Sequence, residues 1–288
     1  MRRRAEALLM RGLLGLFRLL PLDLASGLGG RAGRAIGPYL GVSGRARRNL
    51  QLCGIGENQA EREAVIRGMW DNLGRTFCEY AHLPAFRIYE TDSRVEVRGL
   101  EHVGRAIAPG KGAIFVSGHF ANWELLPMAL VQRGFEVMAV YRPASNPLTD
   151  EIITRLRHEA GVTHQAPKGG SGARMLLAWM GERKHAAMLS DQKMNDGIEA
   201  PFFGRPAMCP SAAAVLARRF GCPLIFASIR RTRGAHFIIE AEPPFYVAET
   251  VDRNGDILAA VTEINRRLER FIRACPEQWL WLHRRWPD

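Results

Sequence analysis

The chain has 288 residues, of which 47% are hydrophobic and 24% are charged. This length and balance exclude a disordered chain and a protein with many membrane-spanning helices, and they fit one large domain. The net charge of +11 is uneven, because residues 1–48 hold ten arginines and two acids and so carry +8 of it. A basic end on a nearly neutral body indicates an anionic partner: nucleic acid, anionic lipid or an acidic protein.

Cysteine and histidine spacing argues against cross-links and metals. The five cysteines contain no C-x-x-C pair and cannot all pair internally, so we expect no disulfide framework and a reducing compartment. The eight histidines show no zinc-ligand spacing, so we expect no metal site.

The first predicted element is an apolar helix over residues 5–20, which a proline ends. Arg4, Arg11 and Arg18 recur every seven residues and therefore share one stripe of this helix. An arginine at the centre of a bilayer costs about 2.5–3.5 kcal/mol, so the pattern favours a helix that lies in the membrane interface. A spanning helix and an ordinary soluble helix stay open as alternatives.

The body of the chain alternates short apolar runs with helical patterns, after a long predicted helix over residues 58–83. The predicted strands are 95–98, 112–117, 136–141, 185–190, 223–230 and 236–241. The later predicted helices are 122–133, 149–160, 172–183, 210–220 and 256–274. This alternation predicts a single α/β domain with a mixed, largely parallel central sheet flanked by helices. We assign it residues 31–288 and assign residues 1–30 to a membrane-associating segment.

The stretch that carries most chemical information is GAIFVSGHFANWELLPMAL, residues 112–130. His119 follows a predicted strand, where open α/β sheets place their ligand sites, and Glu124 falls in the first turn of the next helix. A carboxylate bonded to one imidazole nitrogen leaves the other free as a base, so we expect Glu124 to orient His119. In the plainer interpretation, Asn122 caps the helix and Glu124 complements its dipole.

The motif GHFANWE, with four residues between its histidine and its glutamate, resembles that of the bacterial late lipid A acyltransferases, the lauroyl and myristoyl transferases. Related mannoside acyltransferases share the motif. Five further stretches follow in the order of that family: VYRPASNPLTD, the downstream Arg157, SDQK, FFGRPA and the terminal PEQWLWLHRRW.

The resemblance implies a fold like that of the glycerolipid acyltransferases and an O-acyltransferase at the cytoplasmic face of the inner membrane. Its donor would be an acyl-carrier-protein thioester and its acceptor a hydroxyl of a lipid A precursor, with anionic membrane lipids as a further partner. His119 would act as general base and Glu124 would polarise it, without an acyl-enzyme and without a cofactor. The donor thioester could be carried by acyl carrier protein or by coenzyme A, and the sequence specifies no acyl chain length.

The resemblance also assigns roles to further residues. As catalytic it implies His119, Glu124, Arg157 and Asp191, with Arg157 on an anionic headgroup or the oxyanion and Asp191 positioning Arg157 or the acceptor. As substrate-binding it suggests Arg142, Asn122, Phe202 and Phe203. The two phenylalanines line an acyl channel or pack the core. Trp279, Trp281 and Trp286 of the terminal motif suit a membrane interface, with core packing as the alternative for Trp279 and Trp281.

Three functions are alternatives to acyl transfer onto a lipid A precursor. The same chemistry could act on a lysophospholipid, an ornithine lipid or another glycolipid. A non-catalytic lipid-binding protein is disfavoured by the intact set of catalytic residues. We expect no nucleic-acid partner, because the N-terminal arginines alternate with leucines rather than with stacking aromatic residues.

Overall fold

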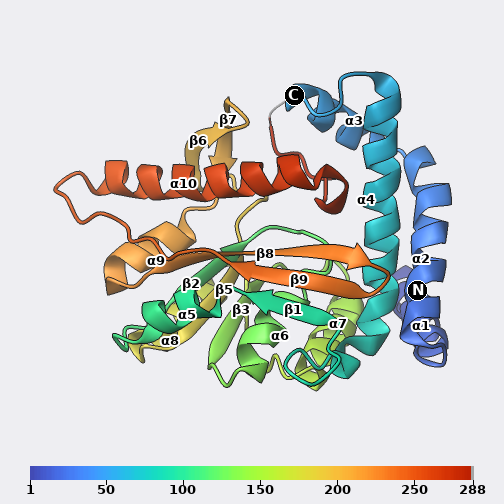
Figure 1. Ribbon diagram of the computed structural model, residues 1–288, viewed down its shortest axis with the longest axis horizontal. Coiled ribbons are helices and arrows are strands. Elements are labelled where there is room, and N and C mark those ends of the chain that lie inside the picture. Colours follow the sequence, from blue (N-terminus) through green and yellow to red (C-terminus); the bar gives the residue numbers. More distant parts are fainter. Residues whose placement is uncertain (287–288) are drawn as a thin grey trace.

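A seven-stranded sheet forms the centre of the protein in the computed structural model, which describes residues 1–286 (Figure 1). Its strands, in spatial order, are β1 (Val95–Arg98), β9 (His236–Ala241), β8 (Leu224–Arg233), β2 (Ile114–Ser117), β5 (His185–Leu189), β3 (Val137–Tyr141) and β4 (Gln165–Pro167). Every neighbouring pair is parallel except β8 and β9. The prediction of a mixed, largely parallel sheet is therefore confirmed.

Helices precede, connect and follow the strands of the sheet. The α-helices are α1 (Arg2–Arg18), α2 (Leu22–Ile36), α3 (Ser43–Leu52), α4 (Gln59–Glu79), α5 (Leu100–Ile107), α6 (Leu125–Gln132), α7 (Pro147–Glu159), α8 (Gly170–Gly181), α9 (Ala212–Phe220) and α10 (Arg253–Ala274). The short 3-10 helices are η1 (Gly37–Tyr39), η2 (Tyr80–Ala85) and η3 (Pro276–Gln278).

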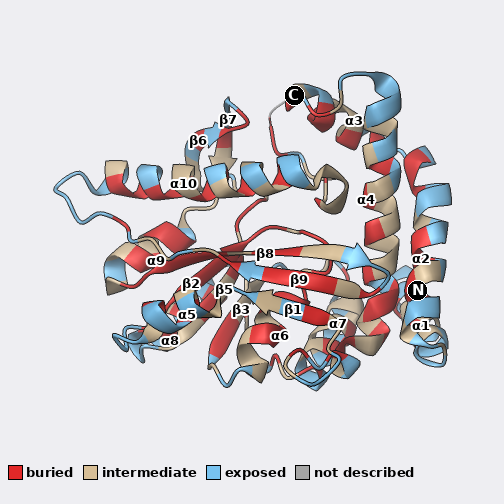
Figure 2. Ribbon diagram, in the orientation of Figure 1, coloured by how far each residue is buried: buried red, intermediate tan, exposed pale blue. Residues whose placement is uncertain are grey.

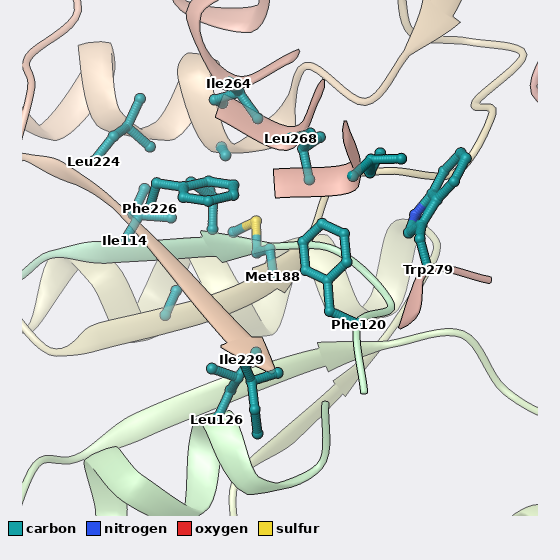
Figure 3. Close-up of a cluster of buried hydrophobic side chains, with 14 of the residues drawn as sticks. Ile114, Phe120, Leu126, Met188, Leu224, Phe226, Ile229, Ile264, Leu268 and Trp279 are labelled. Carbon is teal, nitrogen blue, oxygen red and sulfur yellow. The ribbon is translucent and has the colours of Figure 1, made fainter. Parts of the chain in front are cut away.

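The centre of the sheet is buried on both faces (Figure 2). On one face, Ile114 of β2 and Phe226 of β8 lie under Ile264 and Leu268 of α10 (Figure 3). On the other face, Phe115 packs with side chains of α5 and α6. Because successive side chains of a strand point to opposite faces, the unbroken apolar run in β2 places it between two layers of helices.

Several elements were not predicted from the sequence: α2, α3, α5, β4 and a hairpin made by β6 (Ile198–Phe202) and β7 (Arg205–Cys209). The hairpin contains the FFGRPA motif, and its turn places Phe203 and Gly204 at φ of 53° and 68°. Two consecutive left-handed residues are typical of a type I′ turn. Propensity disfavours α2, because four of its fifteen residues are glycine.

The glycines of α2 let it lie unusually close to α4. A Cβ atom on Gly33 would overlap the carbonyl oxygen of Trp70, and one on Gly74 would overlap that of Gly29. Small residues allow helix backbones to approach this closely, so packing rather than propensity holds α2 in place. Residue 30 lies within α2, and the division of the chain at residues 30 and 31 stays a prediction.

Helix α1 has two apolar stripes. Ala7 and Leu14 are buried against Ile152 and Leu156 of α7. Leu8 and its neighbours on the opposite stripe are exposed. Among residues 1–286, ten of the fifteen large hydrophobic residues that are exposed lie between residues 1 and 40. Within residues 1–286, no helix is both long and apolar enough to cross a bilayer.

The close approach of α2 and α4 predicts opposite effects for two glycines of one helix. Gly33→Ala should lower the free energy of unfolding by about 1–3 kcal/mol, because the added methyl meets the backbone of α4. Gly27→Ala should leave the free energy of unfolding unchanged or raise it by up to about 1 kcal/mol, because a Cβ there would meet only the Arg31 guanidinium, at an ordinary contact distance of 3.8 Å, and alanine favours a helix. Urea denaturation measures both, and equal effects at the two sites would contradict the packing argument.

Candidate active site

The site begins where two neighbouring parallel strands end. Ser117, the last residue of β2, pairs with Leu189, the last residue of β5, so the residues that follow them meet at one edge. His119 comes two residues after β2 and Asp191 two residues after β5. The Nδ1 atom of His119 lies 2.8 Å from Oδ1 of Asp191, and the backbone N–H of His119 donates to Oδ2 at 2.9 Å.

Asp191 is fully buried and also accepts a 2.8 Å hydrogen bond from the indole N–H of Trp279. Burial alone would raise the pKa of Asp191. The charge of His119 and the hydrogen bonds from its ring and backbone outweigh burial and hold the pKa well below its ordinary value. An ionised carboxylate only accepts hydrogen bonds, so the Nδ1 of His119 carries a proton, and the Nε2 offers a lone pair whenever the ring holds that one proton alone.

Glu124 does not orient His119, which corrects the expectation from the sequence. Its two carboxylate oxygens accept hydrogen bonds of 2.7 Å from Nε and Nη2 of Arg157. The hydroxyl of Tyr80 and the indole N–H of Trp123 donate to Oε1 as well. Within residues 1–286 no hydrogen bond joins Glu124 to His119, because arginine, tyrosine and tryptophan donors occupy the carboxylate. Asp191 makes the bond that the sequence assigned to Glu124.

The Glu124–Arg157 pair is itself largely buried, with side chains 4% and 15% exposed. Burial would raise the pKa of Glu124, but the charge of Arg157 and the hydrogen bonds from Arg157, Tyr80 and Trp123 lower it below its ordinary value. Asp191 was expected to position Arg157 or the acceptor. Its contacts are instead with His119 and Trp279, and α7 brings Arg157 to Glu124.

Two residues at the site were missed by the sequence analysis. The side-chain nitrogen of Gln192 lies 3.1 Å from Nε2 of His119 and 2.8 Å from Nε2 of His283. Both residues stand in stretches that carried the family resemblance, SDQK and WLHRRW. Adjacency to Asp191 was the only signal for Gln192, and no spacing in the sequence connects it with His283.

A cavity of about 770 Å³ opens at this edge of the sheet. His119, Glu124, Arg157 and Arg142 line it, together with Gln192 and His283. Most of its wall is apolar and is made by side chains of the sheet and of α5, α6 and α8. A largely apolar cavity with a few convergent polar groups at its mouth is the usual form of a small-molecule site.

The remaining predicted substrate residues lie away from the cavity. Asn122 is buried, and its amide N–H donates to Glu79, so it neither caps a helix nor faces the cavity. Phe202 and Phe203 are buried among tryptophans of the terminal motif, with Phe202 stacked on Trp286. The core-packing alternative therefore describes both phenylalanines, Trp279 and Trp281. Trp286, expected at a membrane interface, is buried in the same core, which corrects that expectation. Within residues 1–286, no cluster of three or more possible metal ligands is present.

Comparisons with known proteins identify similar sequences. A family profile described as bacterial lipid A biosynthesis acyltransferase matches residues 1–288. The chain is 30% identical over 287 residues to the lipid A biosynthesis palmitoleoyltransferase of Escherichia coli K12, across 95% of this chain and 88% of that protein. It is 28% identical over 254 residues to the lauroyltransferase of the same organism, across 83% and 76%.

Two more distant likenesses were found. The chain is 25% identical over 224 residues to a phosphatidylinositol mannoside acyltransferase of Mycobacterium tuberculosis H37Rv, across 75% of this chain and 68% of that protein. The crystal structure of a 1-acyl-sn-glycerophosphate acyltransferase from Thermotoga maritima aligns over 99% of this chain and 100% of that one, with 12% identity and a TM-score of 0.38. At that score, the expected likeness to the glycerolipid acyltransferase fold stays a prediction.

The buried pair predicts a large penalty for removing one partner. Arg157→Met should lower the free energy of unfolding by about 3–5 kcal/mol at pH 7, because it leaves the Glu124 carboxylate buried without its counter-charge. Adding Glu124→Gln should recover part of that loss. Arg155→Met, on the same helix, breaks an exposed pair with Glu151 and should cost less than about 1 kcal/mol. Urea denaturation of the three variants measures this, and equal losses for Arg157→Met and Arg155→Met would refute the argument.

Proposed function

The chain belongs to the bacterial lipid A biosynthesis acyltransferase family, as its motifs indicated, and we propose that it moves a fatty acyl group from an acyl-carrier-protein thioester to a hydroxyl of a lipid A precursor. The observation that carries this proposal is the His119–Asp191 pair at the mouth of a largely apolar cavity. The cavity suits an acyl chain, and the free Nε2 of His119 suits a base.

The proposed reaction is a direct transfer. The Nε2 of His119 takes the proton of the acceptor hydroxyl while the oxygen attacks the thioester carbonyl carbon. The carbon–sulfur bond then breaks, and the proton passes from His119 to the leaving thiolate. Asp191 holds the ring and stabilises its positive charge. Glu124 acts by holding Arg157, which with Arg142 contacts phosphate on the acceptor.

The positions of the cysteines support transfer without an acyl-enzyme. Cys209 and Cys222 are fully buried, and burial raises the pKa of Cys222 to about 11. Within residues 1–286, no cysteine lines the cavity. A thiol that is buried and protonated is a poor nucleophile, which supports the acceptor hydroxyl as the attacking group. The proposed transfer uses no cofactor.

We further propose that the N-terminal helices bind the cytoplasmic face of the inner membrane without crossing it. Leu8 and Leu16 on the exposed stripe of α1 supply apolar contact, and Arg4, Arg11 and Arg18 beside it face anionic headgroups. Residues 1–30 then form the membrane-associating segment of the predicted division, and residues 31–288 the acyltransferase domain.

The dyad predicts the loss of acyl transfer in two variants. His119→Ala and Asp191→Asn should each lower kcat by about 10²–10⁴-fold, because the base is lost in one and misoriented in the other. The double variant should be little worse than either single variant. Lauroyl-carrier-protein and a lipid A precursor are the substrates, and mass spectrometry detects the product. His158→Ala, an exposed histidine of α7, is the control.

Two outcomes would contradict the mechanism. One is turnover by His119→Ala at the rate of the wild type. The other is a stable acyl adduct on the protein, seen by intact-protein mass spectrometry when the donor is supplied alone and competent for transfer when the acceptor is added. Transfer to a lysophospholipid, an ornithine lipid or a mannoside in preference to the lipid A precursor would replace the acceptor and keep the chemistry.

The membrane proposal predicts a salt-dependent affinity. Replacing Arg4, Arg11 and Arg18 by Gln should weaken binding to phosphatidylglycerol vesicles by at most about 3 kcal/mol, and by less at high salt. Replacing the exposed Arg174, Arg183 and Arg253 by Gln removes the same charge elsewhere and should have a smaller effect. Vesicle co-sedimentation measures both, and equal effects would contradict binding through α1.

A further inference from the structure

The cavity beside His119 reaches round the end of the sheet and has an arm on each face. Adjacent residues of one strand line it: Phe115 and Val116 in β2, and Ala187 and Met188 in β5. Because successive side chains of a strand point to opposite faces, one member of each pair faces α5 and α6 and the other faces the opposite layer. Helices of both layers line the cavity accordingly, α5 and α6 on one face and α8 and α9 on the other.

The two arms differ in polarity. The apolar arm, between the sheet and helices α5 and α6, is walled largely by aliphatic and aromatic side chains such as Val103 and Phe115. The mixed arm, between the sheet and helices α8 and α9, combines apolar side chains with Ser190 and with the backbone of Gly170 at the start of α8. Both arms meet at His119. A molecule that reacts there can therefore extend an apolar part to one side and an amphipathic part to the other.

Ser190 is a buried residue whose hydroxyl has no protein partner. It is 4% exposed and lines the cavity, and within residues 1–286 its side chain makes no hydrogen bond. Its backbone N–H donates to the carbonyl oxygen of Ser117 at 2.8 Å, which fixes it directly before Asp191. A buried hydroxyl without a partner is unfavourable, so a ligand group or water is expected there. Because Asp191 holds His119, that ligand group lies close to the reacting atoms.

The outer end of the mixed arm favours an anion. Lys168 is exposed, lines the cavity and, within residues 1–286, forms no ion pair. Helix α8 begins beside it without a side-chain cap, so the N–H groups of its first turn are unpaired. Asp196 is the acidic side chain among the described residues that line this arm. The lysine charge and the positive end of the helix dipole both attract a negative group.

We propose that the mixed arm binds the pantetheine part of the donor thioester, while the apolar arm takes its acyl chain. The proposal rests on the acyl transfer proposed above and locates the donor. Pantetheine is a chain of methylene and methyl groups interrupted by two amides, and it continues into a phosphate in a carrier protein or in coenzyme A. Ser190 bonds the amide nearest the sulfur, and Lys168 with the start of α8 meets the phosphate. The reverse placement would bury both amides without partners in the apolar arm.

Binding of unreactive donor analogues tests the arms without catalysis. S-dodecyl-pantetheine carries both parts, whereas S-dodecyl-N-acetylcysteamine keeps the chain and only the amide nearest the sulfur. By calorimetry, the wild type should bind the longer analogue about tenfold or more tightly. Ala173→Phe narrows the outer part of the mixed arm and should remove that difference without weakening the shorter analogue. Ala178→Phe makes the same change at an exposed residue of α8 outside the cavity lining and should preserve the difference.

Two further variants act on either side of the sulfur. Ser190→Ala should weaken both analogues by the same factor, about two- to tenfold, because each contains the nearest amide. Ala187→Leu fills the apolar arm and should also weaken both equally. An undiminished preference for the longer analogue in Ala173→Phe, or unchanged binding of both analogues in Ser190→Ala, would overturn the proposal. If Ala187→Leu does not fold, the other two variants still decide.

Turnover completes the comparison and separates the two sources of the arm. Dodecanoyl-carrier-protein and dodecanoyl-coenzyme A both contain phosphopantetheine, and the higher kcat/KM in the wild type identifies the source. Ala173→Phe should raise KM for either donor about tenfold, and Lys168→Gln about threefold at low salt, with KM for the lipid A precursor unchanged. A rise in KM for the precursor alone would place one of its own acyl chains in the mixed arm and overturn the proposal. A wild type that transfers no acyl group would instead refute the proposed function, and the calorimetry would still decide what the mixed arm binds.

Discussion

A buried carboxylate that must stay ionised is the constraint on which the site depends. Asp191 is 0% exposed, and an unpaired charge at such a depth costs several kcal/mol. Three donors satisfy it: the backbone and the ring of His119 and the indole of Trp279. They come from the loop after β2 and from the C-terminal segment. Segments more than a hundred residues apart in the chain are therefore held at one point, and the tautomer of His119 follows from the same bonds.

A second buried carboxylate, Glu79, helps to hold the loop that carries His119. Glu79 of α4 pairs with Arg231 of β8 and accepts hydrogen bonds from Ser26 of α2 and from Asn122. Next to Asn122, the backbone of Ala121 takes a left-handed φ of 43°, which is uncommon for a residue other than glycine. Strain of this kind persists where surrounding contacts hold the backbone in place. Here the buried bonds that Glu79 makes to Arg231, Ser26 and Asn122 provide such contacts.

The N-terminal helix contributes to both the surface and the site. One stripe of α1 packs on α7, the helix whose Arg157 reaches Glu124, while the opposite stripe is left to the exterior with its leucines and arginines. Heptad spacing in the sequence revealed the arginine stripe of α1. It could not reveal the buried stripe, because helical periodicity does not distinguish a face that meets protein from one that meets lipid.

Local patterns in the sequence determined the α/β alternation, most strand positions and the placing of His119 at the end of a strand, because apolar runs and turn residues act over a few neighbouring residues. The ordered motifs determined the family. Only the tertiary structure decided which carboxylate meets His119. Glu124 is five residues away and Asp191 is seventy-two, yet β2 and β5 are neighbours in the sheet and so bring Asp191 to the histidine. The tertiary structure alone likewise brings Gln192 and His283 to His119. Strand order and the path of the C-terminal segment are set by packing across the whole domain, which no local spacing records.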